Sequence, residues 1–218
     1  MQKKCFPMPF DLPRFYPILD SGIAARHGID LVQAAAEILE GGARILQFRH
    51  KSFYSREVFA TMERVAALCR DAGVPFVVND RADLAAMLGA VLHLGQDDLP
   101  PAAARKIVGP GGVIGFSTHN EAQLRGAAAD ATVDYLALGP IFGTATKENP
   151  DPTVGLAELR RLRPLVDRPL VAIGGITLEN AGATLAAGAD SVAVIGDLFA
   201  EPANLRARTR EWVESTSL

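Results

Sequence analysis

Short apolar runs alternate with amphipathic stretches along almost all of this 218-residue chain, and this alternation limits the possible folds more than any other feature. The runs are too short for helices, and several are apolar at every position, which is typical of strands buried on both faces of a parallel sheet. The stretches between them repeat their apolar residues with the period of a helix. The runs cover residues 15–19, 44–48, 76–78, 91–94, 113–116, 135–138, 170–173 and 192–195.

Eight strand–helix units predict an α/β protein with one parallel eight-stranded (β/α)8 barrel, the TIM-barrel fold. A doubly wound open sheet uses similar units, but no G-x-G-x-x-G follows the first run, which disfavours it. No linker divides the chain, and three prolines fall within its first 13 residues. We therefore expect an N-terminal tail at 1–13 and a single barrel domain at 14–218, with the last helix near 202–214.

Composition excludes several classes of protein. The 22 basic and 25 acidic residues give a formal charge of −3, which implies no basic surface for duplex nucleic acid. Cys5 and Cys69 lie far apart, so a disulfide framework and a cysteine zinc site are both disfavoured. No apolar run is long enough to cross a bilayer, and the N-terminus has no signal-peptide pattern. The expectation is a cytoplasmic protein with neither nucleic-acid nor membrane partners.

Polar side chains follow most of the predicted strands, at the end of a barrel where active sites lie. Arg49, Lys51 and Lys147 together could hold a group with two or more negative charges, such as pyrophosphate. Asp80 and Asp98 follow adjacent strands and suit Mg²⁺, which one or two carboxylates and substrate phosphate oxygens usually hold. These residues predict a metal-assisted anion site on one rim of the barrel.

A second phosphate could bind at Gly174-Gly175, whose backbone N–H groups open the helix after the seventh strand. Each of these features also has a simpler structural explanation. The two aspartates could cap helices, the glycines could form only a tight turn, and the cations could be solvated strand ends. Inside the barrel, His93 is expected to be a hydrogen-bonded core histidine, and Gln47 could bond within a polar interior layer. His119 opens a helix and need not react.

Six segments stand in an order that resembles the thiamine phosphate synthase family over about residues 15 to 200. They are Gln47-Phe48-Arg49-His50-Lys51, Val78-Asn79-Asp80, His93-Leu94-Gly95-Gln96-Asp97-Asp98, Gly115-Phe116-Ser117-Thr118-His119, Gly139-Pro140-Ile141-Phe142-Gly143-Thr144-Ala145-Thr146-Lys147 and Ile173-Gly174-Gly175-Ile176. The resemblance implies a (β/α)8 barrel and a transferase of thiamine biosynthesis. Such an enzyme joins 4-amino-2-methyl-5-hydroxymethylpyrimidine diphosphate to hydroxyethyl-thiazole phosphate, or its carboxylate, and releases pyrophosphate.

The resemblance also implies residue roles and a dissociative substitution assisted by Mg²⁺. Arg49, Lys51 and Lys147 are expected to stabilise the departing pyrophosphate, and Asp80 and Asp98 to ligate the metal. The small-molecule substrates are the expected partners, and a homodimer is left open. The implied substrate-binding set is Gln47, Phe48, Arg49, His50, Lys51, Asn79, Ser117, Thr144, Ala145, Thr146, Lys147, Gly175, Ile195 and Gly196, of which the segment 144–146 with Gly175, Ile195 and Gly196 matches the thiazole-phosphate pocket.

Three positions depart from the family pattern. His50 replaces a usual acidic residue, Gly143 replaces a proline, and Gly196 replaces a frequent serine. The segment 147–154 contains Pro150 and Pro152, and it could close over bound substrate as a lid.

Three alternatives to the synthase remain. They are a thiazole tautomerase-like barrel with His119 as acid–base group, a Schiff-base aldolase, and a non-catalytic barrel that binds phosphate ligands. The retained cations and carboxylates favour the synthase, and an aldolase would need a lysine inside the barrel.

Overall fold

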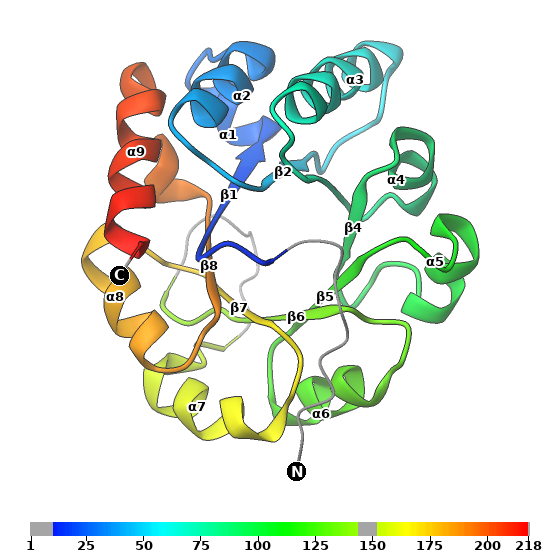
Figure 1. Ribbon diagram of the computed structural model, residues 1–218, viewed down its shortest axis with the longest axis vertical. Helices are drawn as coiled ribbons and strands as arrows, with labels where there is room; N and C mark the ends of the chain where they lie inside the picture. Colours follow the sequence, from blue (N-terminus) through cyan, green and yellow to red (C-terminus); the bar gives the residue numbers. More distant parts are fainter. Residues whose placement is uncertain (1–10, 144–151, 218) are drawn as a thin grey trace.

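The computed structural model describes residues 11–143 and 152–217. Eight parallel strands pair in sequence order, and the first also pairs with the last to close the barrel, as predicted (Figure 1). Register at the closure joins Phe15 to Val192. The strands are β1 (Phe15–Asp20), β2 (Leu46–Arg49), β3 (Phe76–Asn79), β4 (Val91–Leu94), β5 (Ile114–Thr118), β6 (Tyr135–Leu138), β7 (Leu170–Ile173) and β8 (Ser191–Val194).

Helices surround the strands on the outside of the barrel (Figure 1). Five strands differ from the expected runs by one or two residues at an end. The largest differences are at β2, which begins at Leu46, and at β5, which continues to Thr118. The last helix begins at Leu205, after a short 3-10 turn. The helices are α1 (Ser21–Arg26), α2 (Leu31–Glu40), α3 (Arg56–Asp71), α4 (Ala82–Leu88), α5 (Pro101–Val108), α6 (Glu121–Ala129), α7 (Gly155–Leu162), α8 (Leu178–Ala186) and α9 (Leu205–Thr216), with 3-10 turns η1 (Arg163–Leu165), η2 (Gly196–Phe199) and η3 (Pro202–Asn204).

Alternate residues of each strand face opposite sides, which divides the buried side chains into two layers. The larger cluster, which includes Phe48, fills the space between the sheet and the helices. A smaller inner cluster, which includes Tyr16 and Tyr135, fills the barrel itself. The polar interior residues Gln47 and His93 are also buried. The barrel is therefore a packed core, and its open space lies at the ends of the strands.

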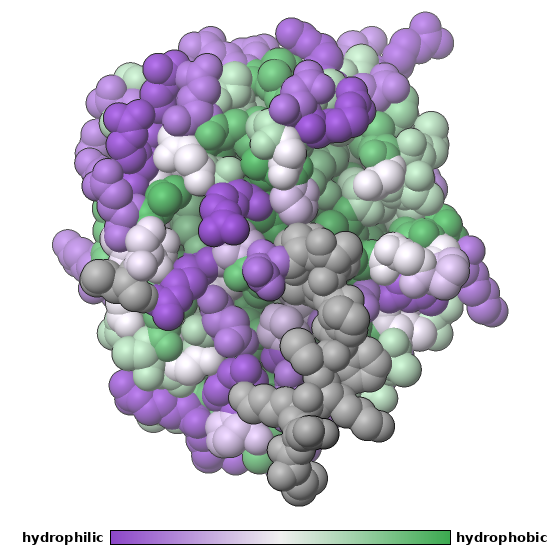
Figure 2. Space-filling view, in the orientation of Figure 1, coloured by the Kyte–Doolittle hydropathy of each residue, from purple (hydrophilic) through white to green (hydrophobic). Residues whose placement is uncertain are grey.

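The C-terminal helix holds the barrel at its closure. The rings of Phe15 on β1 and Trp212 on α9 stack with centroids 5.3 Å apart. Hydrophilic side chains cover the neighbouring surface in Figure 2. Arg206 of α9 forms an ion pair with Glu40 of α2. Leu12 packs against the inner cluster, and the division into a tail and a barrel domain stays a prediction. Within the described ranges, no helix has the length and hydropathy to traverse a bilayer.

Candidate active site

A cavity of about 660 Å³ opens at the carboxyl ends of the strands. It gathers, from six different strands and the loops after them, ten of the residues that the sequence predicts for the site. Side chains from strands so far apart in sequence meet here because parallel strands end at one rim. The ten are Gln47, Arg49, Lys51, Asn79, Asp80, Asp98, Ser117, Gly175, Ile195 and Gly196.

Of the remaining predicted site residues, the two that the structure describes, Phe48 and His50, do not line this cavity. Phe48 is fully buried in the layer between sheet and helices, because its neighbours on β2 face inward. The His50 Nδ1 atom lies 2.7 Å from Ser21 Oγ at the start of α1, in a separate hollow beside the rim. Thr144, Ala145, Thr146 and Lys147 lie outside the described residues, as does most of the expected lid.

Both described cations of the predicted site form ion pairs with rim carboxylates. The Arg49 guanidinium contacts the Asp20 carboxylate at the end of β1. The Lys51 Nζ atom lies 2.5 Å from Asp80 Oδ2, and about half of the Lys51 side chain is exposed (51%). These pairs hold the cations at the mouth of the cavity before any ligand arrives.

The Asp80 carboxylate is held in position by its backbone. Its φ of 67° is left-handed, a conformation that few residues other than glycine adopt and that aspartate tolerates. The Asp80 N–H donates to the carbonyl of His93 on β4 at 2.8 Å. Burial raises the pKa of Asp80 to about 6, and the nearby Asp98 carboxyl adds to this effect while Lys51 opposes it. Neither aspartate is a helix cap, since α4 begins after Arg81 and α5 after Pro100.

Asp98 is oriented by its own loop, where its Oδ2 atom accepts a hydrogen bond from the Gly95 N–H at 2.6 Å. Its carboxylate therefore stays on the rim beside Asp80. Around the described cavity, the acidic residues Asp80, Asp97, Asp98 and Asp197 outnumber the cations Arg49 and Lys51. A phosphate ligand would need a further cation to balance this charge.

Asn79 shows that part of the site is built for a ligand. Its side chain ends β3, is only 6% exposed, and lines the cavity. Its Nδ2 atom has no hydrogen-bond partner among the described residues. A buried amide without an acceptor is costly, so this donor fits a ligand atom that accepts a hydrogen bond.

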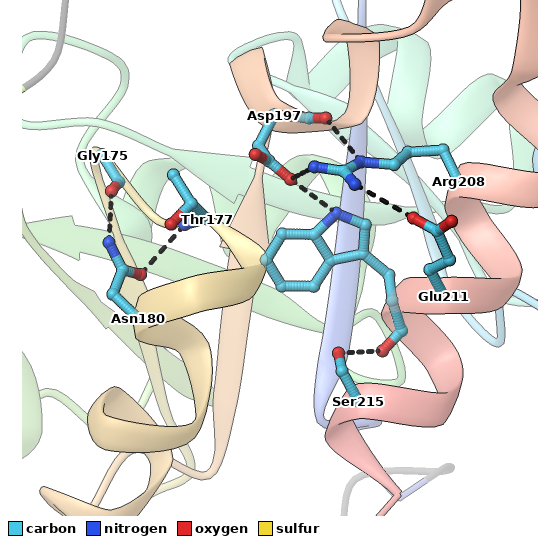
Figure 3. A network of polar contacts seen from close by, with 8 residues as sticks. Gly175, Thr177, Asn180, Asp197, Arg208, Glu211 and Ser215 are labelled. Atoms are coloured by element: carbon cyan, nitrogen blue, oxygen red, sulfur yellow. Dashed lines mark hydrogen bonds and ion pairs between the residues drawn. The ribbon is translucent and has the colours of Figure 1, made fainter.

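The loops after β7 and β8 bring backbone groups to the rim (Figure 3). Gly175 has a φ of 63°, and a Cβ there would lie 2.5 Å from the carbonyl oxygen of Gly143, so only glycine fits. Asn180 of α8 donates to the Gly175 carbonyl at 3.0 Å and accepts from the Thr177 N–H at 2.9 Å. This bracing fixes the turn that carries Gly175.

The β8 loop is braced by the C-terminal helix (Figure 3). Asp197, next to Gly196, accepts hydrogen bonds from Arg208 Nη2 at 2.7 Å and from Trp212 Nε1 at 2.9 Å. The position of Gly196 therefore depends on α9. The sequence at the ends of the strands does not predict this dependence.

Several site residues were missed at the sequence level. Asp20 directly follows the first apolar run, which is a signal that could have found it. Tyr16 and Tyr135 lie inside apolar strands, where nothing in the pattern distinguishes them from core residues. His93 is a hydrogen-bonded core histidine, as the sequence predicts. Gln47 donates a hydrogen bond to Tyr16 inside the barrel, which is one of the two roles open to it from the sequence.

A closed parallel barrel with cations, paired carboxylates and backbone amides at one rim defines a (β/α)8-barrel enzyme for anionic substrates. The family model described as "Thiamine monophosphate synthase" matches residues 15–198. The chain belongs to this family. A thiamine-phosphate synthase of Koribacter versatilis is 48% identical over 207 residues, 93% of this chain and 95% of that protein.

Two further relatives agree. The thiamine-phosphate synthase of Methanoculleus marisnigri is 43% identical over 92% of this chain and 96% of its own length. The structure of a thiamine phosphate pyrophosphorylase from Pyrococcus furiosus is similar with a TM-score of 0.82 and 32% identity. That similarity covers 94% of this chain and 95% of the other.

Proposed function

We propose that this protein is a thiamine-phosphate synthase that joins the pyrimidine diphosphate to a thiazole phosphate and releases pyrophosphate. The observation that carries the proposal is the gathering of ten expected residues around one rim cavity. An aldolase that forms a Schiff base is disfavoured, because none of the eight strands carries a lysine.

The proposed assignment of the pyrimidine rests on Asn79. Its unpaired Nδ2 donor would hydrogen-bond to a ring nitrogen of the aminopyrimidine, which accepts hydrogen bonds. The diphosphate would then extend toward Arg49, Lys51 and Ser117 at the rim. The thiazole phosphate would lie near Gly175 and Gly196.

The described residues fit a magnesium ion at Asp80 and Asp98. The Lys51 ammonium already occupies a cation position beside Asp80, and the excess of rim carboxylates favours another positive charge. Within the described ranges no group of three or more His, Cys, Asp or Glu residues converges as a metal site. Two carboxylates with substrate oxygens are a usual magnesium environment. When bound, the ion would supply a Lewis acid for the departing pyrophosphate.

In this proposal the protein acts mainly by binding, orientation and charge. The bond between the pyrimidine methylene carbon and the diphosphate oxygen breaks, and its electron pair leaves with pyrophosphate. Arg49 and Lys51 stabilise that growing negative charge from positions fixed before the reaction. The thiazole nitrogen then attacks the methylene carbon, and holding both substrates in line lowers the entropic cost of their encounter. Lys147 is proposed to assist on the basis of the family resemblance alone.

The test is an assay with both substrates and Mg²⁺, in which thiamine phosphate is followed by fluorescence after oxidation. Product that is lost with EDTA, and in Asp80→Ala, supports the proposal. Asp83→Ala is the matched control, because Asp83 pairs with Arg81 on the exposed side of α4 and should leave product formation intact. If the folded wild-type protein binds thiazole phosphate but makes no product, the proposal fails in favour of a tautomerase or a binding protein.

Small-molecule substrates follow from the family, and the cytoplasm is the proposed location. The homodimer stays a prediction that a measurement of mass in solution would test.

A further inference from the structure

A continuous line of hydrogen bonds crosses the barrel interior and ends at the rim. Gln47 Nε2 lies 3.0 Å from Tyr16 Oη, which lies 2.9 Å from Tyr135 Oη. Tyr135 Oη lies 3.0 Å from His93 Nδ1, and His93 Nε2 lies 2.9 Å from Ser117 Oγ. The first four residues are buried, whereas Ser117 is half-buried and lines the cavity.

The donors and acceptors of this line determine its direction. A hydroxyl has one proton to donate, and a neutral imidazole carries a proton on only one of its nitrogens. The His93 ring is buried, and its two nitrogens face the hydroxyls of Tyr135 and Ser117 rather than carboxylates, so this environment favours the neutral imidazole. The amide nitrogen of Gln47 can only donate, and it donates to Tyr16. The hydroxyl proton of Tyr16 then has an acceptor in the line only if Tyr16 donates to Tyr135.

The same reasoning continues to the rim. Tyr135 donates to Nδ1 of His93, so the histidine proton resides on Nε2 and is donated to Ser117 Oγ. Because Ser117 accepts this bond, its own hydroxyl proton remains for the cavity side. In the reverse direction Ser117 would donate to His93 and would present only lone pairs to a ligand. Lone pairs would repel the oxygens of a diphosphate.

We propose that Tyr135 and His93 are positioning residues, which turn the Ser117 hydroxyl into a hydrogen-bond donor toward the diphosphate. This inference rests on the proposed function, in which Ser117 contacts that group. The line also explains why polar residues lie inside an otherwise apolar barrel. Each of them has a hydrogen-bond partner within the line, and a connected buried network favours one arrangement of its members.

Packing holds the Tyr135 ring independently of its hydroxyl. A Cβ on Gly115 of the neighbouring strand would lie only 2.0 Å from Tyr135 Cζ, so the ring rests directly on the glycine backbone. Its centroid lies 5.6 Å from that of His93. The variant Tyr135→Phe therefore removes the hydroxyl and leaves the ring in place.

The direct test is nuclear magnetic resonance of the histidine ring nitrogens in the ¹⁵N-labelled, substrate-free full chain at neutral pH. His93→Gln identifies the His93 signals by their loss. We expect the proton on Nε2 in the wild type and in Ser117→Ala, and a loss of this preference in Tyr135→Phe. The matched control is Tyr54→Phe, which removes the hydroxyl of a tyrosine outside the line and should leave His93 unchanged. A proton on Nδ1 in the wild type, or an unchanged tautomer in Tyr135→Phe, overturns the proposal.

Kinetics test the link to Ser117 separately. Tyr135→Phe should lower kcat by about tenfold in the wild-type background, roughly the effect of one hydrogen bond. The same change should have almost no effect in Ser117→Ala, because the residue through which it acts is gone. Equal losses in both backgrounds would indicate a packing defect and refute the positioning role. A wild-type protein with the proton on Nε2 but without product would refute the proposed function and leave the direction of the line established.

Discussion

Asp197→Ala tests whether the C-terminal helix stabilises the rim. The substitution removes the acceptor of the Arg208 and Trp212 hydrogen bonds, both made by side chains of α9. Trp212 is fully buried, so its Nε1–H would be left without a partner inside the protein. A lost bond between charged groups and an unpaired buried donor together cost about 3 kcal/mol of the free energy of unfolding. For a chain of this length, that corresponds to a melting temperature lower by about 6–12 °C.

The assay is thermal and urea unfolding of the variant beside two controls. Asp197→Asn keeps an oxygen for Trp212 and should lose about half as much stability. Glu158→Ala removes another ion-paired carboxylate, 2.6 Å from Arg161, but that pair is exposed to solvent and should contribute far less to the free energy of unfolding. If Asp197→Ala were no more destabilising than Glu158→Ala, the claim that α9 braces the rim would be refuted.

Three further predictions concern ligand binding. Asn79→Ala should change the free energy of unfolding by less than about 1 kcal/mol, because the Asn79 Nδ2 atom has no described protein partner. The same variant should raise KM for the pyrimidine diphosphate about tenfold, and an unchanged KM in steady-state kinetics would contradict this prediction. Lys51→Met should tighten Mg²⁺ binding to the substrate-free protein about fivefold in calorimetry, because the substitution removes the ammonium group that competes with the metal for Asp80. Weaker Mg²⁺ binding in this variant would contradict the prediction. With the pKa of Asp80 at about 6, protonation competes with the metal below that pH. The Mg²⁺ dissociation constant should therefore be about tenfold higher at pH 5 than at pH 7, and a flat profile would exclude Asp80 as the controlling group.

The sequence predicts the barrel well because strands that are buried on both faces have an unmistakable pattern. It also places Arg49, Asp80 and Ser117 on one rim, since each lies one or two residues after the end of an apolar run. It fails for Phe48, because a residue within a binding segment can still face the helices when its neighbours on the strand face inward. It fails too for Asp197, whose partners lie on α9, and no local pattern reports contacts between side chains that are distant along the chain.

The pairing of β1 with β8 has a consequence for how the protein is made. The barrel cannot close until Val192 has been synthesised and can pair with Phe15. At ordinary rates of translation, the ribosome needs roughly 10–35 s to extend the chain from Phe15 to Val192. During that interval one edge of β1 has no neighbour, and an open edge can pair with a strand of another chain. The bracing of the rim by α9 is completed later still. The newborn protein is therefore most vulnerable to aggregation along its first strand, and its catalytic rim is among the last parts to be finished.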